Sequence, residues 1–197
     1  MPLGTHKATL FGVAGVSTGD VVLLASTTAS DAAGIAFTSG IDSTYGEYIF
    51  GFYNIRAAAD DRTFNFQVST DGGSNYNTTV TSAHFHAHHY EDDSGTPAVN
   101  QDTGHHLQQA TSYQLLTASQ GNDADQSCAG ALHLFSPAST TYVKQWYSEI
   151  NFTAVTDYTD HCFNAGYFNT TSAVNAINFQ FSADNIAAGT IKMWGVK

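Results

Sequence analysis

The sequence predicts an all-β fold of antiparallel strands, and three observations point to it. Only 12% of the 197 residues are Asp, Glu, Lys or Arg, whereas aromatic residues reach 13%; helical surfaces normally carry more Glu and Lys. Apolar and polar residues alternate along several segments. Turn-forming clusters separate these segments, and no stretch keeps a 3.6-residue apolar period long enough to predict a helix. We therefore expect an antiparallel sandwich or barrel.

The segment EYIFGFYNIR at residues 47–56 carries a clear strand signal. Large apolar side chains would occupy both faces of this strand: Tyr48, Phe50 and Phe52 on one face, and Ile49, Tyr53 and Ile55 on the other. A strand with two apolar faces is expected in the middle of a sheet.

Two further segments alternate between apolar and polar residues, as expected for strands with one face in the core and one in solvent. RTFNFQVS, at 62–69, divides into an inward and a water-facing set: Phe64, Phe66 and Val68 inward, and Thr63, Asn65 and Gln67 outward. INFQFS, at 177–182, repeats the period, with Ile177, Phe179 and Phe181 opposite Asn178 and Gln180.

The remaining strand signals lie towards the C-terminus. TTYVKQWYSEINF, at 140–152, places four large side chains on one face: Tyr142, Trp146, Ile150 and Phe152. GTIKMWGVK is interpreted as the last strand, with Ile191 and Met193 opposite Lys192 and Trp194. Turn formers at 71–73, 136–139 and 187–189 are spaced as in an antiparallel sandwich or barrel.

The chain is expected to form a single domain over residues 1–197, because it shows no internal repeat and no linker. We interpret residues 1–19 as an N-terminal arm and first strand. Residues 91–127 are the least regular region and are interpreted as two long polar loops around a short element near Tyr113 to Leu116. Long loops in a compact domain usually carry contacts.

Charge and hydropathy exclude two classes of partner. The formal net charge is −11 and only six residues are basic, too few to neutralise a phosphate track, so nucleic-acid binding is not expected. No apolar run approaches the roughly 18 residues of a membrane span, and MPLGTHKATLFG lacks the apolar segment of a secretory signal. We expect a soluble protein that does not bind membranes and is not exported by that route.

The sequence offers no catalytic residues. It contains no G-x-S-x-G elbow, no P-loop and no G-x-G-x-x-G, and acidic residues beside turns are ordinarily solvated caps. Cys128 and Cys162, 34 positions apart, form no metal signature and are expected to be free thiols in or near the core. An enzyme is therefore not expected.

The stretch STDGGSNY at 69–76 matches most of the Asp-box pattern S-x-D-x-G-x-T-W, which is best known from sialidases. Asn75 and Tyr76 depart from that pattern, and the chain has two arginines where a sialidase uses three. Asp71, Gly72 and Gly73 instead suit a tight hairpin, because glycine tolerates positive φ and the Asp side chain bonds forward to the backbone. The stretch is predicted to be a turn.

The stretch HFHAHHYEDD at 84–93 is a second candidate for chemistry. On a strand, His84, His86 and His88 share one face at a spacing of ~7 Å, with Phe85 on the other face. The row could be a solvent-facing polar row, an interface between subunits, a divalent metal site or a catalytic zinc site. The metal hypothesis needs a third ligand, for which there are several candidates: His133, His105 or a carboxylate from Glu91, Asp92 and Asp93.

Three blocks of the sequence are specific enough to compare with a known family. They span 37–79, 135–151 and 165–197 and include GIDSTY, VSTDGGSNYN and GTIKMWG. Together they resemble a family of virion structural proteins, capsid-decorating or tail-fibre-like, from tailed phages of marine bacteria and cyanobacteria. The resemblance implies a β-sandwich of jelly-roll type on the exterior of the particle and no catalytic residues. It does not extend to the histidine row.

The expected function is therefore that of an outer capsid decoration protein, made in the cytoplasm of the bacterial host and located in the virion. Its expected partners are copies of itself, as a homotrimer or ring, and other virion proteins such as the major capsid protein. Aromatic enrichment with few charges is typical of such interfaces. One alternative is a glycan-binding module of a tail fibre, in which Tyr90, Tyr113 or Trp194 stacks on sugars. The other is a metal-dependent enzyme.

Overall fold

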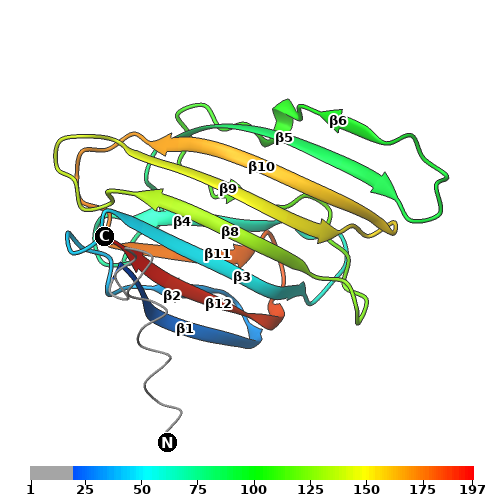
Figure 1. Ribbon diagram of the computed structural model, residues 1–197, viewed down its shortest axis with the longest axis horizontal. Coiled ribbons are helices and arrows are strands. Elements are labelled where there is room, and N and C mark those ends of the chain that lie inside the picture. Colours follow the sequence, from blue (N-terminus) through cyan, green and yellow to red (C-terminus); the bar gives the residue numbers. More distant parts are fainter. Residues whose placement is uncertain (1–19) are drawn as a thin grey trace, which may run out of the picture.

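The computed structural model describes residues 20–197, which form two antiparallel sheets (Figure 1). Eight strands make up the large sheet, in this order: β1 (Val21–Ala32), β12 (Ile186–Val196), β3 (Glu47–Ala57), β8 (Cys128–Phe135), β9 (Lys144–Thr153), β10 (Tyr158–Phe168), β5 (Val80–Tyr90) and β6 (Ala98–Asn100). Four strands make up the small sheet: β2 (Ile35–Phe37), β11 (Ala176–Phe181), β4 (Phe64–Ser69) and β7 (Gln114–Leu115). The predicted all-β, antiparallel class is confirmed. The predicted arm and first strand at 1–19 lie outside the described residues.

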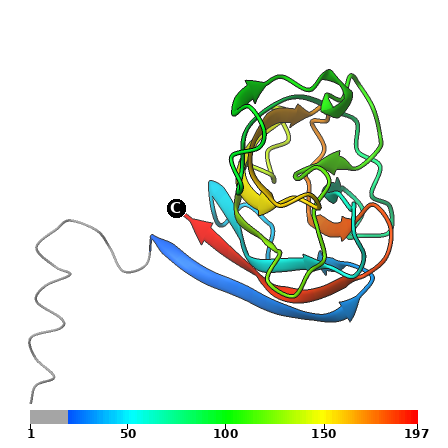
Figure 2. The same ribbon diagram turned by 90° about the vertical axis from the view of Figure 1, so that its right-hand side faces the viewer.

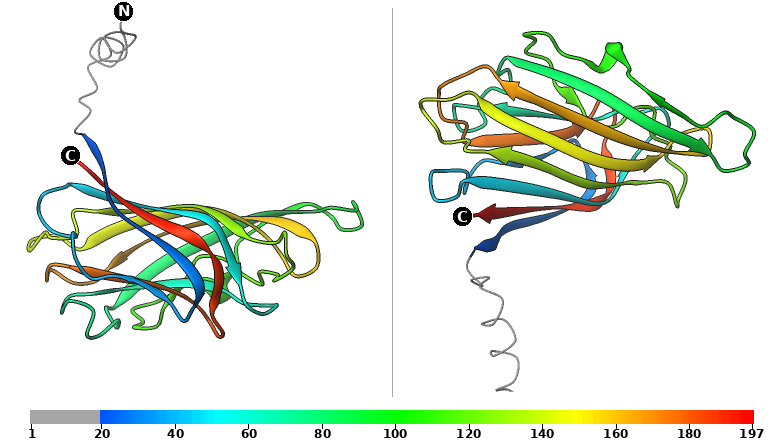
Figure 3. Two further views of the ribbon diagram at one scale, coloured as in Figure 1. Left: turned by 90° about the horizontal axis from the view of Figure 1, so that it is seen from below. Right: turned by 45° about the horizontal axis from the view of Figure 1, so that its top comes forward.

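The large sheet curls around the small one, so that the two layers share one core (Figures 2 and 3). Phe179 of β11 lies at the centre of this core. Its ring centroid is 5.4 Å from Phe50 and 5.2 Å from Phe52, both on β3. Phe66 of β4 reaches further across, to Trp146 of β9 at 4.9 Å. Such aromatic pairs stabilise the fold by about 0.5–1.5 kcal/mol each beyond the area they bury.

The segment 47–56 forms the central strand that its two apolar faces predict, because β3 lies between β12 and β8. Tyr48, Phe50 and Phe52 are buried in the core, as expected. The placement of Ile55 on the opposite face is wrong. Asn54 has φ of 51° and the pairing with β8 shifts between Phe52 and Ile55, so this bulge turns Ile55 into the core.

The segment 62–69 forms β4, but its predicted water-facing side is buried. Phe64, Phe66 and Val68 point into the core, yet Asn65 is only 8% exposed and Gln67 is fully buried. The reason is a layer of loops on the outer side of the small sheet. The Gln67 side-chain nitrogen donates to the carbonyls of Thr78, Thr111 and Ser112, and its oxygen accepts from the Val68 amide, so both polar atoms are satisfied without water.

The C-terminal predictions are largely confirmed, with two corrections. Phe179 and Met193 are buried with their same-face neighbours. Tyr142 does not share the buried face of β9; it precedes the strand and is 73% exposed. Residues 187–189 form no turn, because they lie within β12, where Gly189 has φ of 117° at an irregularity in the pairing.

The turn at 71–73 is confirmed, but it does not close a hairpin. Gly72 and Gly73 have φ of 72° and 90°, values that favour glycine. The strands on either side belong to different sheets, since β4 lies in the small sheet and β5 in the large one. The turn therefore carries the chain from one layer to the other.

Residues 91–127 are mostly irregular, as predicted, and the short element expected near 113–116 is β7. The region also contains β6 and a 3₁₀ turn, η1 (Thr103–His105). It follows β5 closely, because the Val80 amide donates to the Ala110 carbonyl and the Ser82 amide donates to the Leu107 carbonyl. None of the helices described is long and apolar enough to cross a membrane.

Candidate functional site

The histidine row of β5 points into the molecule. In the pairing with β10, His84 lies opposite Asn164 and His86 opposite Cys162. His84 is only 1% exposed, whereas Phe85 on the other face is 48% exposed. The hypothesis of a solvent-facing polar row is therefore wrong. The alternation along β5 is as predicted, but the face that turns inward is the polar one.

His84 is held by an amide whose orientation is fixed. The Asn164 side-chain nitrogen donates to the Leu116 carbonyl and the Ser148 hydroxyl, at 3.3 Å in both cases. Its oxygen therefore faces His84, and His84 Nδ1–H donates to it at 2.8 Å. His84 Nε2 is buried and has no hydrogen-bond partner. Burial lowers the pKa of His84, which favours the neutral ring with a lone pair on Nε2.

His86 is held by a buried carboxylate. Its Nδ1–H donates to Asp160, whose two oxygens lie 2.8 and 3.0 Å away. The Asp160 side chain is 1% exposed and that of His86 is 18% exposed. A carboxylate only accepts hydrogen bonds, so the proton is on Nδ1 and the Nε2 atom is the one that is left for another partner.

A third imidazole comes from the loop that covers β5. His105 ends η1, and its ring centroid is 4.9 Å from that of His84 with the planes at 80°. His105 Nδ1 is buried without a hydrogen bond, although Asp102 Oδ2 lies 3.3 Å away. Burial lowers the pKa of His105. His106 Nε2–H donates to the His84 carbonyl at 3.0 Å and so fastens this loop to the strand.

Of the other predicted ligands, His88 adjoins this cluster, whereas His133 and the carboxylates at 91–93 lie apart from it. The His88 ring stacks on that of His86 at 5.6 Å and also contacts Tyr90 and Tyr158, and its buried Nδ1 has no partner among residues 20–197. His133 lies on the outer face of the sheet and donates to Glu47. The carboxylates at 91–93 lie in the exposed turn after β5. Within residues 20–197, no three His, Cys, Asp or Glu side chains converge on one metal position as their rings stand.

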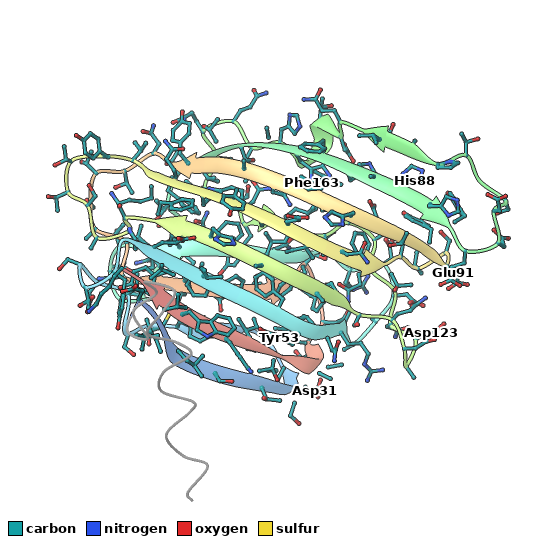
Figure 4. All side chains as sticks on the ribbon, viewed as in Figure 1. Asp31, Tyr53, His88, Glu91, Asp123 and Phe163 are labelled. Atoms are coloured by element: carbon teal, nitrogen blue, oxygen red, sulfur yellow. The ribbon has the colours of Figure 1, made fainter. Side chains whose placement is uncertain are left out.

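The outer face of the large sheet is the second candidate site, and it is unusually apolar. Phe85 and Phe163 are cross-strand partners whose rings stack at 4.7 Å, and His133 and Tyr147 stack in the same way at 4.5 Å. Tyr53 is 46% exposed and Tyr147 42% exposed. Figure 4 shows the side chains of this face, with Tyr53 and Phe163 labelled.

Two shallow hollows lie on this face, one on each side of Tyr147. The first has a volume of about 350 Å³ and is floored by Ala129 and Ala131. The second, of about 240 Å³, is floored by Ala83 and Ala165. The first hollow also has two polar walls: His133 donates to Glu47 at 2.5 Å, and His161 donates to Glu149 at 3.0 Å.

The aromatic residues proposed for sugar binding are not brought together. Tyr90 packs against Tyr158 at 5.0 Å, and the Tyr113 hydroxyl accepts a hydrogen bond from Asn178. Trp194 lies beside Tyr53 on the outer face. The sequence reasoning missed Phe163, because the segment 158–168 was not interpreted as a strand. Its alternation of Asp160, Cys162 and Asn164 with His161 and Phe163 carries that signal.

The Asp71 carboxylate is used for hydrogen bonds within its own turn. The Asp71 carboxylate accepts hydrogen bonds from the Ser69 hydroxyl and from the backbone and side-chain nitrogens of Asn75. These bonds lower the pKa of Asp71 to about 2. Cys128 and Cys162 are free and buried, as predicted, and burial raises the pKa of both thiols, which makes them poor nucleophiles.

Comparison of the chain with protein-family models, curated proteins and solved structures gave no significant match.

Proposed function

We propose that the chain is a non-enzymatic structural protein of a bacteriophage particle, an outer capsid decoration protein that associates with copies of itself. The observation that carries this proposal is the outer face of the large sheet. It exposes Phe85, Tyr147 and Tyr53 beside alanine-floored hollows. An extended apolar surface of this kind is typical of a protein–protein interface.

We infer a jelly-roll topology from the order of the strands. The first four strands pair antiparallel with later strands in reverse chain order: β1 with β12, β2 with β11, β3 with β8 and β4 with β7, with β9 and β10 left out of the series. These eight strands form the rows β1-β12-β3-β8 and β2-β11-β4-β7, as expected for a rolled-up double Greek key. Strands β9, β10, β5 and β6 then extend the first row. Jelly rolls occur in viral capsid and lectin domains, which supports the proposed virion role without deciding it.

The edge of the large sheet supports self-association as well. β1 is an edge strand that pairs with β12, and Val21 and Leu23 on it are 55% and 52% exposed. An apolar edge strand invites pairing with another chain, and symmetric contact is a common way to cover it. We propose a homotrimer or ring in contact with the major capsid protein, assembled in the cytoplasm of the bacterial host.

The first hollow favours a second candidate, a glycan-binding module of a tail fibre. Glu149 and Asn151 could hold hydroxyl groups there beside Tyr147. The stacking of the rings argues against it, because the faces of Phe163 and Tyr147 are turned towards Phe85 and His133. Sugars need open ring faces, whereas protein interfaces also use ring edges.

Sedimentation of the purified chain tests the proposal. We expect a trimer or ring for the parent protein and a shift towards monomer for Tyr147→Lys, because Tyr147 forms the ridge between the two hollows. Tyr142→Lys is the matched control, since Tyr142 is exposed but precedes β9. A parent protein that stays monomeric, both free and on particles, contradicts the proposal. Retention on a glycan array, lost in Tyr147→Lys, would favour the fibre module.

A further inference from the structure

The two buried histidines of β5 are arranged in the way that metal ligands are arranged. Metal-binding imidazoles commonly donate their second ring N–H to a carboxylate or an amide oxygen, which fixes the ring and leaves the other nitrogen for the metal. His84 donates through Nδ1 to Asn164, and His86 donates through Nδ1 to Asp160. Both rings therefore direct Nε2 away from β10.

His84 Nε2 has no hydrogen-bond partner among residues 20–197. The atom is buried in a residue that is only 1% exposed. A buried acceptor without a hydrogen bond is destabilising, and most buried polar atoms of folded proteins are satisfied by protein or water. A missing ligand would explain this one.

The loop above β5 brings a further nitrogen to the same place. His105 lies edge-on to His84, and its Nδ1 is also buried and without a hydrogen bond. The Asp102 carboxylate lies beside it, held by the Gly104 amide at 2.8 Å. The rings of His84 and His86 are 5.5 Å apart, so three imidazoles lie next to one another between strand and loop, with the Asp102 carboxylate, 43% exposed, at their edge.

We propose that this region is a transition-metal site, in which His84 Nε2, His86 Nε2 and His105 bind one Zn²⁺ or a similar cation. The three rings do not meet on one point as they stand, and those of His84 and His86 are 5.5 Å apart, so binding requires these two rings to tilt towards each other and the His105 ring to turn towards the strand. Asn164 and Asp160 act as positioning residues that hold the two strand ligands. Imidazole is a suitable ligand for zinc, nickel and cobalt. The Asp102 carboxylate, beside His105, offers an oxygen ligand as well.

His88 is not part of the proposed site, although it belongs to the same row. Its ring stacks on that of His86 at 5.6 Å, but no carboxylate or amide among residues 20–197 accepts a hydrogen bond from it, and its other ring contacts are Tyr90 and Tyr158. This distinction separates the proposal from simple binding by a histidine-rich strand. His88 and the outer-face His161 are therefore the matched controls.

Titration of the metal-stripped protein with Zn²⁺ tests the inference, followed by calorimetry and by the visible spectrum of the Co²⁺ form. We expect one ion per chain and a tetrahedral Co²⁺ spectrum. His105→Gln should weaken binding at least tenfold, and Asp160→Asn should weaken it roughly 10- to 100-fold, the range for loss of such a supporting group. His88→Gln and His161→Gln should bind as the parent does.

His105→Gln is the decisive variant, because a loop histidine can be replaced with less effect on folding than the buried His84. The absence of binding at micromolar Zn²⁺ would overturn the proposal. So would binding that depends on His88 or His161 but not on His105. None of these outcomes bears on self-association, so this inference and the proposed function can fail separately.

Discussion

In β5 and β10 the inner face is polar and the outer face is apolar, the reverse of the arrangement in most sheets. The inner face carries His84, His86, Asp160 and Asn164, which bond to one another across the strands. The outer face carries apolar rings such as Phe85, which is 48% exposed. Over β3 and β9 the usual arrangement returns, with Phe50 and Trp146 in the core. The inner face is thus bonded across the strands, with His84 Nε2 left without a hydrogen bond, whereas the outer face exposes apolar rings, and we propose a separate role for each face.

A pair of substitutions on one strand measures the difference most directly, and it should give the largest effect. Phe168 of β10 is fully buried against Phe66 and Trp146, so Phe168→Ala should lower the free energy of unfolding by about 3–5 kcal/mol. Phe163→Ala, on the outer face, should lower it by about 1 kcal/mol, the value of its stacking. Urea unfolding of dilute protein measures both. Equal losses would mean that the outer face is also part of the monomer core.

The polar network should contribute less than the aromatic core but more than a surface contact. Asn164→Ala removes the acceptor of His84 Nδ1 and the donor to Leu116 and Ser148. Buried groups left without partners should then reduce the free energy of unfolding by about 1–3 kcal/mol. Asn151→Ala on the outer face of β9 is the control and should change it by less than about 0.5 kcal/mol. A neutral Asn164→Ala would show that water replaces the amide.

The two faces of β5 also show how much of the fold and of the site can be predicted from the sequence. The alternation of apolar and polar residues in a strand predicts which side chains share a face. It correctly places His84, His86 and His88 opposite Phe85. It does not state which face is covered. Gln67 and His84 are buried because loops from 101–117 lie over them, and loop paths have no periodic signal. The bulge at Asn54, which turns Ile55 into the core, likewise leaves no periodic signal in the sequence. His105 was one of several candidate ligands, and its position beside His84 depends on the path of the loop.

Substitution in the turn between the two sheets should have the smallest effect on stability. It tests whether this turn determines which face of β5 points inward. The pKa of Asp71 is lowered from 3.8 to about 2, first by the Asn75 side chain and then by the Ser69 hydroxyl. The folded state therefore favours the carboxylate, and the resulting stability is present above pH 3.8 and is lost as the pH falls towards 2. Asp71→Asn should melt at a lower temperature than the parent at pH 7, and the gap should narrow between pH 4 and pH 2.

The turn variant should leave the histidine face unchanged, because the pairing of β5 with β10 runs over its whole length, from Val80 to Tyr90. Nuclear magnetic resonance of the imidazole protons of His84 and His86 can follow that face at pH 7. Their shifts should match those of the parent protein, while the amide signals of 69–76 move. If the histidine signals move as well, the turn helps to set which face of β5 points inward, and the strand register alone does not explain the inverted arrangement.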